Sequence, residues 1–204
     1  MARPTLQPEE IERFRENLCN VALRRFTKDG YAGVTLRALA RELGCSYATP
    51  YRYFRDKEHI FAAVRALAYE RFGEALSAGT EHLTDPEQRI RSLTGAFLRF
   101  AREQPQSYRM MFELHQPGTD SHPEYWAKER DAWKFWEQEI QSAVEADFLR
   151  GDPSLIAHLF WSGIHGVVTL DLAGKLVLGK TVDELVASLT DALLKTYQSP
   201  NPHP

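Results

Sequence analysis

The stretch TLRALARELGCSYATPYRYFRDK, residues 35–57, consists of two short segments with helical periodicity on either side of Gly44. Thr35 can cap the first segment, whose apolar face is Leu36, Leu39, Ala40 and Leu43. Gly44 can end it, because glycine adopts positive φ without steric cost, and Ser46 can cap the second segment. Two helices joined by such a turn form a helix-turn-helix, whose second helix enters the major groove of DNA.

Residues before and within this stretch form a longer ordered pattern. It comprises a Phe, a Gly-Tyr pair, the capping Thr, an aliphatic-Ala pair, a Gly-x-Ser turn, and a Tyr-x-x-Phe followed by a Lys. This order resembles the DNA-binding signature of the TetR family of bacterial regulators, and it is more specific than any single short motif. The matching residues are Phe26, Gly30-Tyr31, Thr35, Leu39-Ala40, Gly44-Cys45-Ser46, Tyr51-Arg52-Tyr53-Phe54 and Lys57.

Two residues depart from the family pattern. Ala38 stands where an acidic residue would complete a capping box with Thr35. Pro50 would be the fourth residue of the second helix, where it lacks the N–H of the first intrahelical bond and crowds the carbonyl of Ser46. The sequence therefore predicts a second helix that begins after Ser46 and has a first turn that Pro50 tightens or tilts.

The resemblance implies a role for most residues of the second helix. Tyr47, Ala48 and Thr49 would approach base edges, where methyl groups can contact thymine. Others would hold phosphates, which positions a protein on DNA without specifying sequence. The alternative for Tyr51 is a core aromatic, and for Arg37 a solvated surface position. The candidate DNA contacts are Thr35, Arg37, Ser46, Tyr47, Ala48, Thr49, Tyr51, Arg52 and Lys57.

The charge distribution agrees with a DNA-binding N-terminal part. The chain has a formal net charge of −3, but residues 1–60 contain 11 Lys and Arg against 8 Asp and Glu. The remainder contains 14 against 20 and is therefore acidic. Positive charge thus coincides with the predicted helix-turn-helix, as attraction to phosphates requires.

Helical periodicity recurs along the rest of the 204 residues, and no stretch reads as a convincing strand. Asp56, Asp85-Pro86, Asp152-Pro153 and Thr181 can each open a helix. We predict an all-α protein of about nine helices. It comprises an N-terminal three-helix DNA-binding domain with the helix-turn-helix over residues 1–56, a larger helical ligand-binding and dimerisation domain over 57–198, and a disordered tail over 199–204.

The C-terminal half resembles a second known pattern. A Trp, then His-Gly, then Leu-x-x-Gly marks the Trp/His-Gly (WHG) type of C-terminal domain in some TetR regulators, and here Trp161, His165-Gly166 and the stretch 170–174 match it loosely. The helix expected over 152–174 is apolar on nearly every face, which favours burial in a homodimer over burial within its own domain. Gly163 and Gly166 would let a partner backbone approach.

The middle of the chain is rich in aromatic residues. In the TetR family the corresponding domain holds an inducer pocket, and aromatic and Met side chains line small-molecule sites well. The resemblance thus implies an unidentified small-molecule effector, apolar or aromatic in character. An aromatic stripe at helical spacing can equally be core, and His165 can be a core histidine. The candidate ligand contacts are Phe97, Phe100, Tyr108, Met111, Trp133, Trp136, Trp161 and His165.

The sequence predicts a cytoplasmic homodimeric regulator, most simply a repressor, that a small molecule releases from a palindromic double-stranded DNA operator. We expect no cofactor, no metal, no enzymatic activity and no membrane association, since catalytic motifs, a signal peptide and an uninterrupted apolar span are all lacking. Two cysteines without Cys-x-x-Cys spacing fit a reducing compartment. The alternatives are a sensor or carrier with a purely structural helix-turn-helix, and a helical metalloenzyme that uses His158 and His165.

Overall fold

The computed structural model describes residues 7–112, 114 and 122–200, and within them it contains eight α-helices, one 3-10 turn and no strand. This confirms the predicted all-α fold of about nine helices. The helices form two compact units, the first from the described residues within 1–69 and 106–129 and the second from those within 70–105 and 130–204. The domain boundary after residue 56 stays a prediction.

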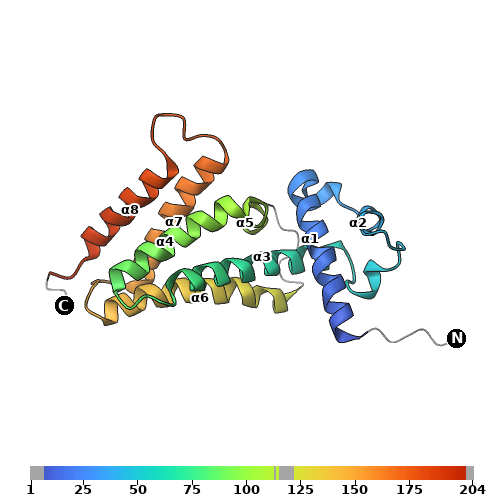
Figure 1. Ribbon diagram of the computed structural model, residues 1–204, viewed down its shortest axis with the longest axis horizontal. Helices are drawn as coiled ribbons and strands as arrows, with labels where there is room; N and C mark the ends of the chain where they lie inside the picture. Colours follow the sequence, from blue (N-terminus) through green and yellow to red (C-terminus); the bar gives the residue numbers. More distant parts are fainter. Residues whose placement is uncertain (1–6, 113, 115–121, 201–204) are drawn as a thin grey trace. The chain divides into compact units, whose positions relative to one another are not determined.

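The first unit begins with α1 (Pro8–Gly33), which Gly30 interrupts with a φ of 71°, and α2 (Leu36–Glu42). A 3-10 turn, η1 (Pro50–Arg52), leads to α3 (Lys57–Thr80), and the unit also contains most of α5 (Pro105–Phe112) and the start of α6 (Pro123–Glu145) (Figure 1). Asp56 opens α3 as predicted, because its Oδ1 accepts the N–H of His59 at 2.7 Å.

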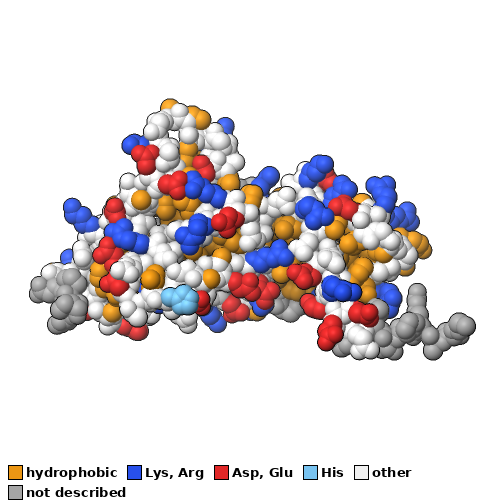
Figure 2. All heavy atoms as spheres, viewed as in Figure 1, with side chains coloured by type: hydrophobic (Ala, Val, Ile, Leu, Met, Phe, Trp, Pro, Cys, Tyr) orange, Lys and Arg blue, Asp and Glu red, His pale blue; other side chains and the backbone are white. Residues whose placement is uncertain are grey.

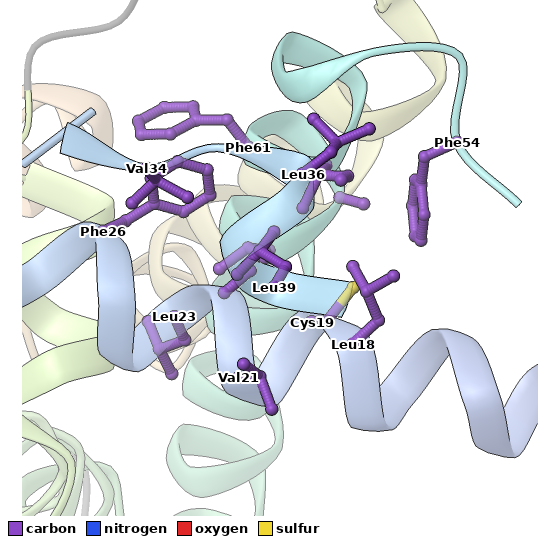
Figure 3. Close-up of a cluster of buried hydrophobic side chains, with 14 of the residues drawn as sticks. Leu18, Cys19, Val21, Leu23, Phe26, Val34, Leu36, Leu39, Phe54 and Phe61 are labelled. Atoms are coloured by element: carbon purple, nitrogen blue, oxygen red, sulfur yellow. The ribbon is translucent and has the colours of Figure 1, made fainter. Parts of the chain in front are cut away.

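One hydrophobic core joins the elements of the first unit. Phe26 of α1, Leu39 of α2 and Ile60 of α3 are fully buried in it, and Met110 of α5 is buried against the same cluster. Phe54, which follows η1, is 2% exposed and points into this core (Figure 3). Burying side chains of this size stabilises the unit by about 1.5–3 kcal/mol each, so α1, α2 and the chain after η1 are held as one body.

The predicted helix after Ser46 is wrong, because residues 46–53 form turns around η1. The N–H of Thr49 donates to the Ser46 carbonyl at 2.9 Å and that of Arg52 to the Thr49 carbonyl at 3.0 Å, so both bonds span three residues. Pro50 has no N–H for the four-residue bond to Ser46. The Ser46 hydroxyl pairs with the Thr49 hydroxyl at 2.9 Å instead of capping a helix.

Restoring the N–H at position 50 is expected to lengthen this turn. In Pro50→Ala, NMR contacts between residues 46 and 54 should shift from a three-residue to a four-residue helical pattern. Pro86→Ala is the matched control, because Pro86 stands in the first turn of α4, where the N–H that alanine introduces has no partner within the helix. An unchanged pattern in Pro50→Ala would show that Pro50 is not what keeps the segment from becoming α-helical.

The second unit contains the ends of α3 and α6 together with α4 (Pro86–Glu103), α7 (Pro153–Leu172) and α8 (Val182–Tyr197) (Figure 1). The predicted caps are present: Asp85 accepts the N–H of Gln88 at 2.8 Å, Asp152 that of Ser154 at 3.0 Å, and Thr181 forms a capping box with Glu184. Helices α4, α7 and α8 pack against one another.

The C-terminal end of the described chain differs from the sequence-based expectation. Helix α6 ends at Glu145, and Asp147 just beyond it adopts a φ of 55°. The backbone then pairs with the end of α8, where the N–H of Ser199 donates to Phe148 at 2.9 Å and that of Arg150 to Tyr197 at 2.8 Å. Ser199 is buried and ordered by these bonds, although we predicted a disordered tail from this residue onward. Residues 201–204 lie outside the described part.

Candidate nucleic-acid interface

Helix α2 sets the geometry of the candidate interface. Thr35 caps it as predicted, since its hydroxyl accepts the N–H of Ala38 at 3.2 Å. Gly44, with a φ of 65°, ends it. Leu36, Leu39 and Ala40 face the core, so Arg37 on the opposite side is exposed. Thr35 therefore has a structural role, and its contact with phosphate stays a prediction.

The segment after Gly44 presents two large aromatic side chains to solvent. Tyr47 is 66% exposed and Tyr51 is 56% exposed, which excludes the core alternative for Tyr51. Ala48 and Arg52 are also exposed, and Thr49 is half-buried. The buried Pro50 and Phe54 anchor the segment between these residues. An anchored backbone that exposes tyrosines and arginines together is suited to binding a polar, negatively charged partner.

Positive charge surrounds this exposed segment. The guanidinium of Arg37 on α2 lies 5.8 Å from the ring centre of Tyr47, within the range of a cation–π contact between α2 and the exposed segment. On the face drawn in Figure 2, Lys and Arg side chains gather over the α1–α2 region. The pairing of Arg37 with Tyr47 brings together two of the predicted DNA contacts.

Lys57, which we predicted to bind phosphate, contacts the protein's own backbone and an aromatic ring. Its ammonium donates to the Tyr31 carbonyl at 2.9 Å and lies 4.2 Å from the centre of the Tyr31 ring. The side chain is half-buried and holds the end of α1 against the start of α3. Its contact with DNA stays a prediction.

Sequence reasoning missed the residues that hold the chain just after η1. The guanidinium of Arg15 on α1 donates to the Tyr53 carbonyl at 3.1 Å and to the Tyr125 hydroxyl at 3.2 Å, and it lies 4.7 Å from the centre of the Phe54 ring. His59 Nε2 lies 3.0 Å from the same Tyr125 hydroxyl. These residues are far apart along the chain, so no local spacing could have grouped them.

His59 and His122 stack within this group, with ring centres 4.8 Å apart. His59 Nδ1 accepts the N–H of Arg55 at 3.1 Å, and this bond requires an unprotonated nitrogen. Burial lowers the pKa of His59 below its ordinary 6.5, and the positive charges of His122, Arg55 and Arg15 lower it further against the opposing effect of Asp56. The folded protein therefore favours neutral His59.

Acidification is consequently expected to destabilise the protein through His59. Because the folded state has the lower pKa, the unfolded chain binds more protons once the pH falls below about 6.5. Urea unfolding at pH 7.5, 6.5 and 5.5 should show a loss of unfolding free energy that is smaller in His59→Asn, whose amide oxygen can still accept the Arg55 N–H. Equal losses in the two proteins would contradict this role of His59.

The eight predicted ligand contacts fall into separate groups. Tyr108 and Met111 are buried in the first unit. In the core of the second unit, Phe72 contacts both Phe97 and Phe100, with ring centres 5.2 and 5.1 Å apart, and Trp136 donates to the Ala157 carbonyl at 3.0 Å. The buried members therefore serve as core, and their contact with a ligand stays a prediction.

Trp133, Trp161 and His165 form a half-buried aromatic group on α6 and α7. The rings of Trp161 and His165 stack 5.4 Å apart, and Trp133 meets the edge of Trp161 at 6.1 Å. His158 contacts Trp133 at 4.4 Å, while its Nδ1 lies 2.7 Å from the Ser154 carbonyl. In the described part of the chain no three His, Cys, Asp or Glu side chains are placed to hold a metal ion.

Helix α7 leaves apolar side chains exposed. Ile156, Phe160 and Ile164 are buried, but Leu155 is 51% and Leu170 47% exposed. By length and composition α7 could cross a membrane, and 28% of its most apolar stretch is buried within the described part of the chain. A surface of this kind is typical of a protein–protein contact.

The two glycines of α7 have different surroundings. A Cβ on Gly163 would lie 2.6 Å from Leu189 of α8, so this glycine allows close packing within the chain and not, as predicted, with a partner. A Cβ on Gly166 would meet nothing within 4 Å, and Gly166 is exposed. Only Gly166 therefore presents open backbone on this helix.

Family comparisons match both parts of the chain. The family model described as bacterial regulatory proteins, tetR family, matches residues 18–64, which include the helix-turn-helix region. The model described as tetracyclin repressor-like, C-terminal domain, matches residues 90–193, about half of the chain. The matched ranges therefore span the exposed segment after Gly44 and the α7–α8 pair.

Individual relatives agree with these matches. The uncharacterized HTH-type transcriptional regulator Rv0681 of Mycobacterium tuberculosis is 27% identical over 78% of this chain and 71% of its own length. The HTH-type transcriptional repressor NicS of Pseudomonas putida is 28% identical over 43% of this chain, and the match spans 42% of that relative. A Rhodococcus sp. RHA1 protein of unknown function has a similar structure, with a TM-score of 0.80, 29% identity and coverage of 91% and 95% of the two chains.

Proposed function

Because the chain belongs to the TetR family of bacterial transcriptional regulators, we propose that it is a ligand-responsive repressor that binds a palindromic operator as a homodimer. The observation that carries this proposal is the exposed segment after Gly44, where a buried proline and a buried phenylalanine anchor two exposed tyrosines beside arginines. A purely structural helix-turn-helix would have no reason to expose them, which argues against a carrier.

On DNA, we assign base readout to Tyr47, Ala48 and Thr49. Tyr51 and Arg52 of the segment bind DNA phosphates, and Arg37 of α2 binds a further phosphate. The proposal is supported by the solvent exposure of all these side chains except Thr49, which is half-buried, and by the basic surface of the α1–α2 region (Figure 2).

The homodimer is proposed to form through α7 and α8. Its support is the exposed apolar side chains of Leu159 and Leu170 and the open backbone at Gly166. Pairing two subunits places two reading segments on one duplex, which a near-palindromic site requires. We place the dimer in the cytoplasm, where bacterial DNA lies and where Cys19 and Cys45 stay reduced.

The effector is proposed to be an apolar or aromatic small molecule bound by the second unit. The half-buried group of Trp133, Trp161 and His165 supports this class, because it offers aromatic faces together with one polar ring. The effector would release the protein from its operator if it bound more tightly to a dimer geometry that does not fit the two half-sites. A ligand shifts the equilibrium between two conformations only by the difference in its affinity for them.

Selection of genomic DNA fragments by the purified protein tests this function. We expect enrichment of one near-palindromic sequence whose two half-sites lie about one helical turn apart. Recovery of fragments without a common sequence would reject the proposed operator binding. The genes beside an enriched fragment would then indicate candidate effectors, which can be tested for release of the same fragment.

A further inference from the structure

A basic cavity of about 500 Å³ lies in the first unit, apart from the exposed segment after Gly44. Its size falls in the range of small-molecule sites, but its lining is charged instead of apolar. Four cationic side chains and one carboxylate surround it, in a chain whose formal net charge is −3. The lining residues come from α1, α2 and α5 and are Arg24, Arg25, Thr27, Lys28, Glu42, Gln106 and Arg109.

The single carboxylate of the lining organises the arginines of α1. Glu42 accepts from Arg25 Nε at 2.6 Å and from Arg24 at 3.3 Å, and Arg25 also pairs with Asp29 at 3.3 Å. These bonds hold both guanidinium groups beside the Glu42 carboxylate. Lys28 has no ion-pair partner in the described part of the chain, so the cavity keeps an excess of positive charge.

We infer that this cavity binds a small molecule that carries two or more negative charges as phosphate or carboxylate groups. Lys28 and Arg24 would hold it from α1, and Arg109 and the Gln106 amide from α5. The concave shape favours a compact anion over a DNA backbone, which is a broad surface. A ligand held in this way would tie α5 to the helices that carry the DNA-reading segment.

The inference is independent of the aromatic effector proposed for the second unit. The two ligands differ in chemistry, since one is a compact polyanion and the other is apolar or aromatic. They also differ in place, since none of the eight predicted ligand contacts lines this cavity. The chain would therefore respond to two unlike signals, and failure of either proposal would leave the other standing.

Titration of the full chain with inorganic pyrophosphate by calorimetry, without DNA and at constant ionic strength, tests the inference. We expect saturable binding of one pyrophosphate per chain. The double variant Lys28→Gln/Arg109→Gln should weaken it at least about tenfold, since charged hydrogen bonds are lost, and Gln106→Glu should weaken it by adding a negative charge. All three side chains are exposed, so the variants should fold.

The matched control is Lys175→Gln/Lys180→Gln, which removes two exposed cations from the second unit and should leave pyrophosphate binding unchanged. Absence of saturable binding, or equal weakening by the control, would overturn the inference. A third outcome also overturns it: no pyrophosphate binding together with weaker operator binding in Lys28→Gln/Arg109→Gln. The cavity would then contact DNA phosphates instead of a small anion.

Discussion

Replacing Tyr47 and Thr49 together by alanine is expected to weaken operator binding by about 10³-fold. Each specific base contact contributes about 1–3 kcal/mol, and a dimer loses four of them at once. Tyr47 is exposed and Thr49 is half-buried, so the fold should tolerate both changes. Fluorescence anisotropy on a selected operator fragment measures the effect.

The matched control for this variant is His82→Ala, which alters a side chain that is 86% exposed and lies in the second unit. It should bind the operator as the unaltered protein does. If the Tyr47/Thr49 variant keeps its affinity and its sequence preference, these residues do not read bases. The sensor or carrier with a structural helix-turn-helix would then be the better account.

Replacing Gly166 by arginine is expected to convert the proposed dimer into monomers. A Cβ at this exposed position would meet nothing within 4 Å in its own chain, so we expect the variant to fold. In the proposed interface it would place a bulky charge against the partner's apolar surface, where an unpaired charge is costly. We expect at least about a 100-fold rise in the dimer dissociation constant by analytical ultracentrifugation, with loss of tight operator binding.

Ala78→Arg is the control for the dimer experiment, because it makes a comparable change at an exposed position of α3. That variant should stay dimeric. A Gly166→Arg protein that sediments as a dimer at the same concentrations would contradict an interface on this face of α7. A thermal melt of both variants separates loss of pairing from loss of folding.

The sequence predicted those parts of the fold that depend on local signals. The caps at Thr35, Asp56, Asp85, Asp152 and Thr181 all form as expected, because each needs only a side-chain oxygen and the N–H groups two or three residues further along the chain. The apolar periodicity placed Leu36 and Leu39 correctly in the core. These signals were sufficient for the all-α class.

The sequence did not predict features that depend on the choice between a 3-10 turn and an α-helix, or on contacts between residues far apart in the chain. The sequence indicated that Pro50 would distort the first turn of a helix. It did not show that three-residue hydrogen bonds would replace the helix by η1, because apolar periodicity carries no information on hydrogen bonding. Gly163 faces α8 of its own chain, a contact that its place on α7 alone could not reveal. The contacts of Arg15 with Tyr53 and Tyr125 are likewise tertiary.

The central claim is that the segment after Gly44 and its basic surroundings bind duplex DNA, and a salt titration of operator binding tests it most directly. Phosphate contacts release counterions, so the logarithm of the binding constant should fall linearly with the logarithm of salt concentration. We expect a steep slope for the unaltered protein and a shallower one for Arg37→Ala/Arg52→Ala. A flat response of the unaltered protein would contradict DNA binding through this surface.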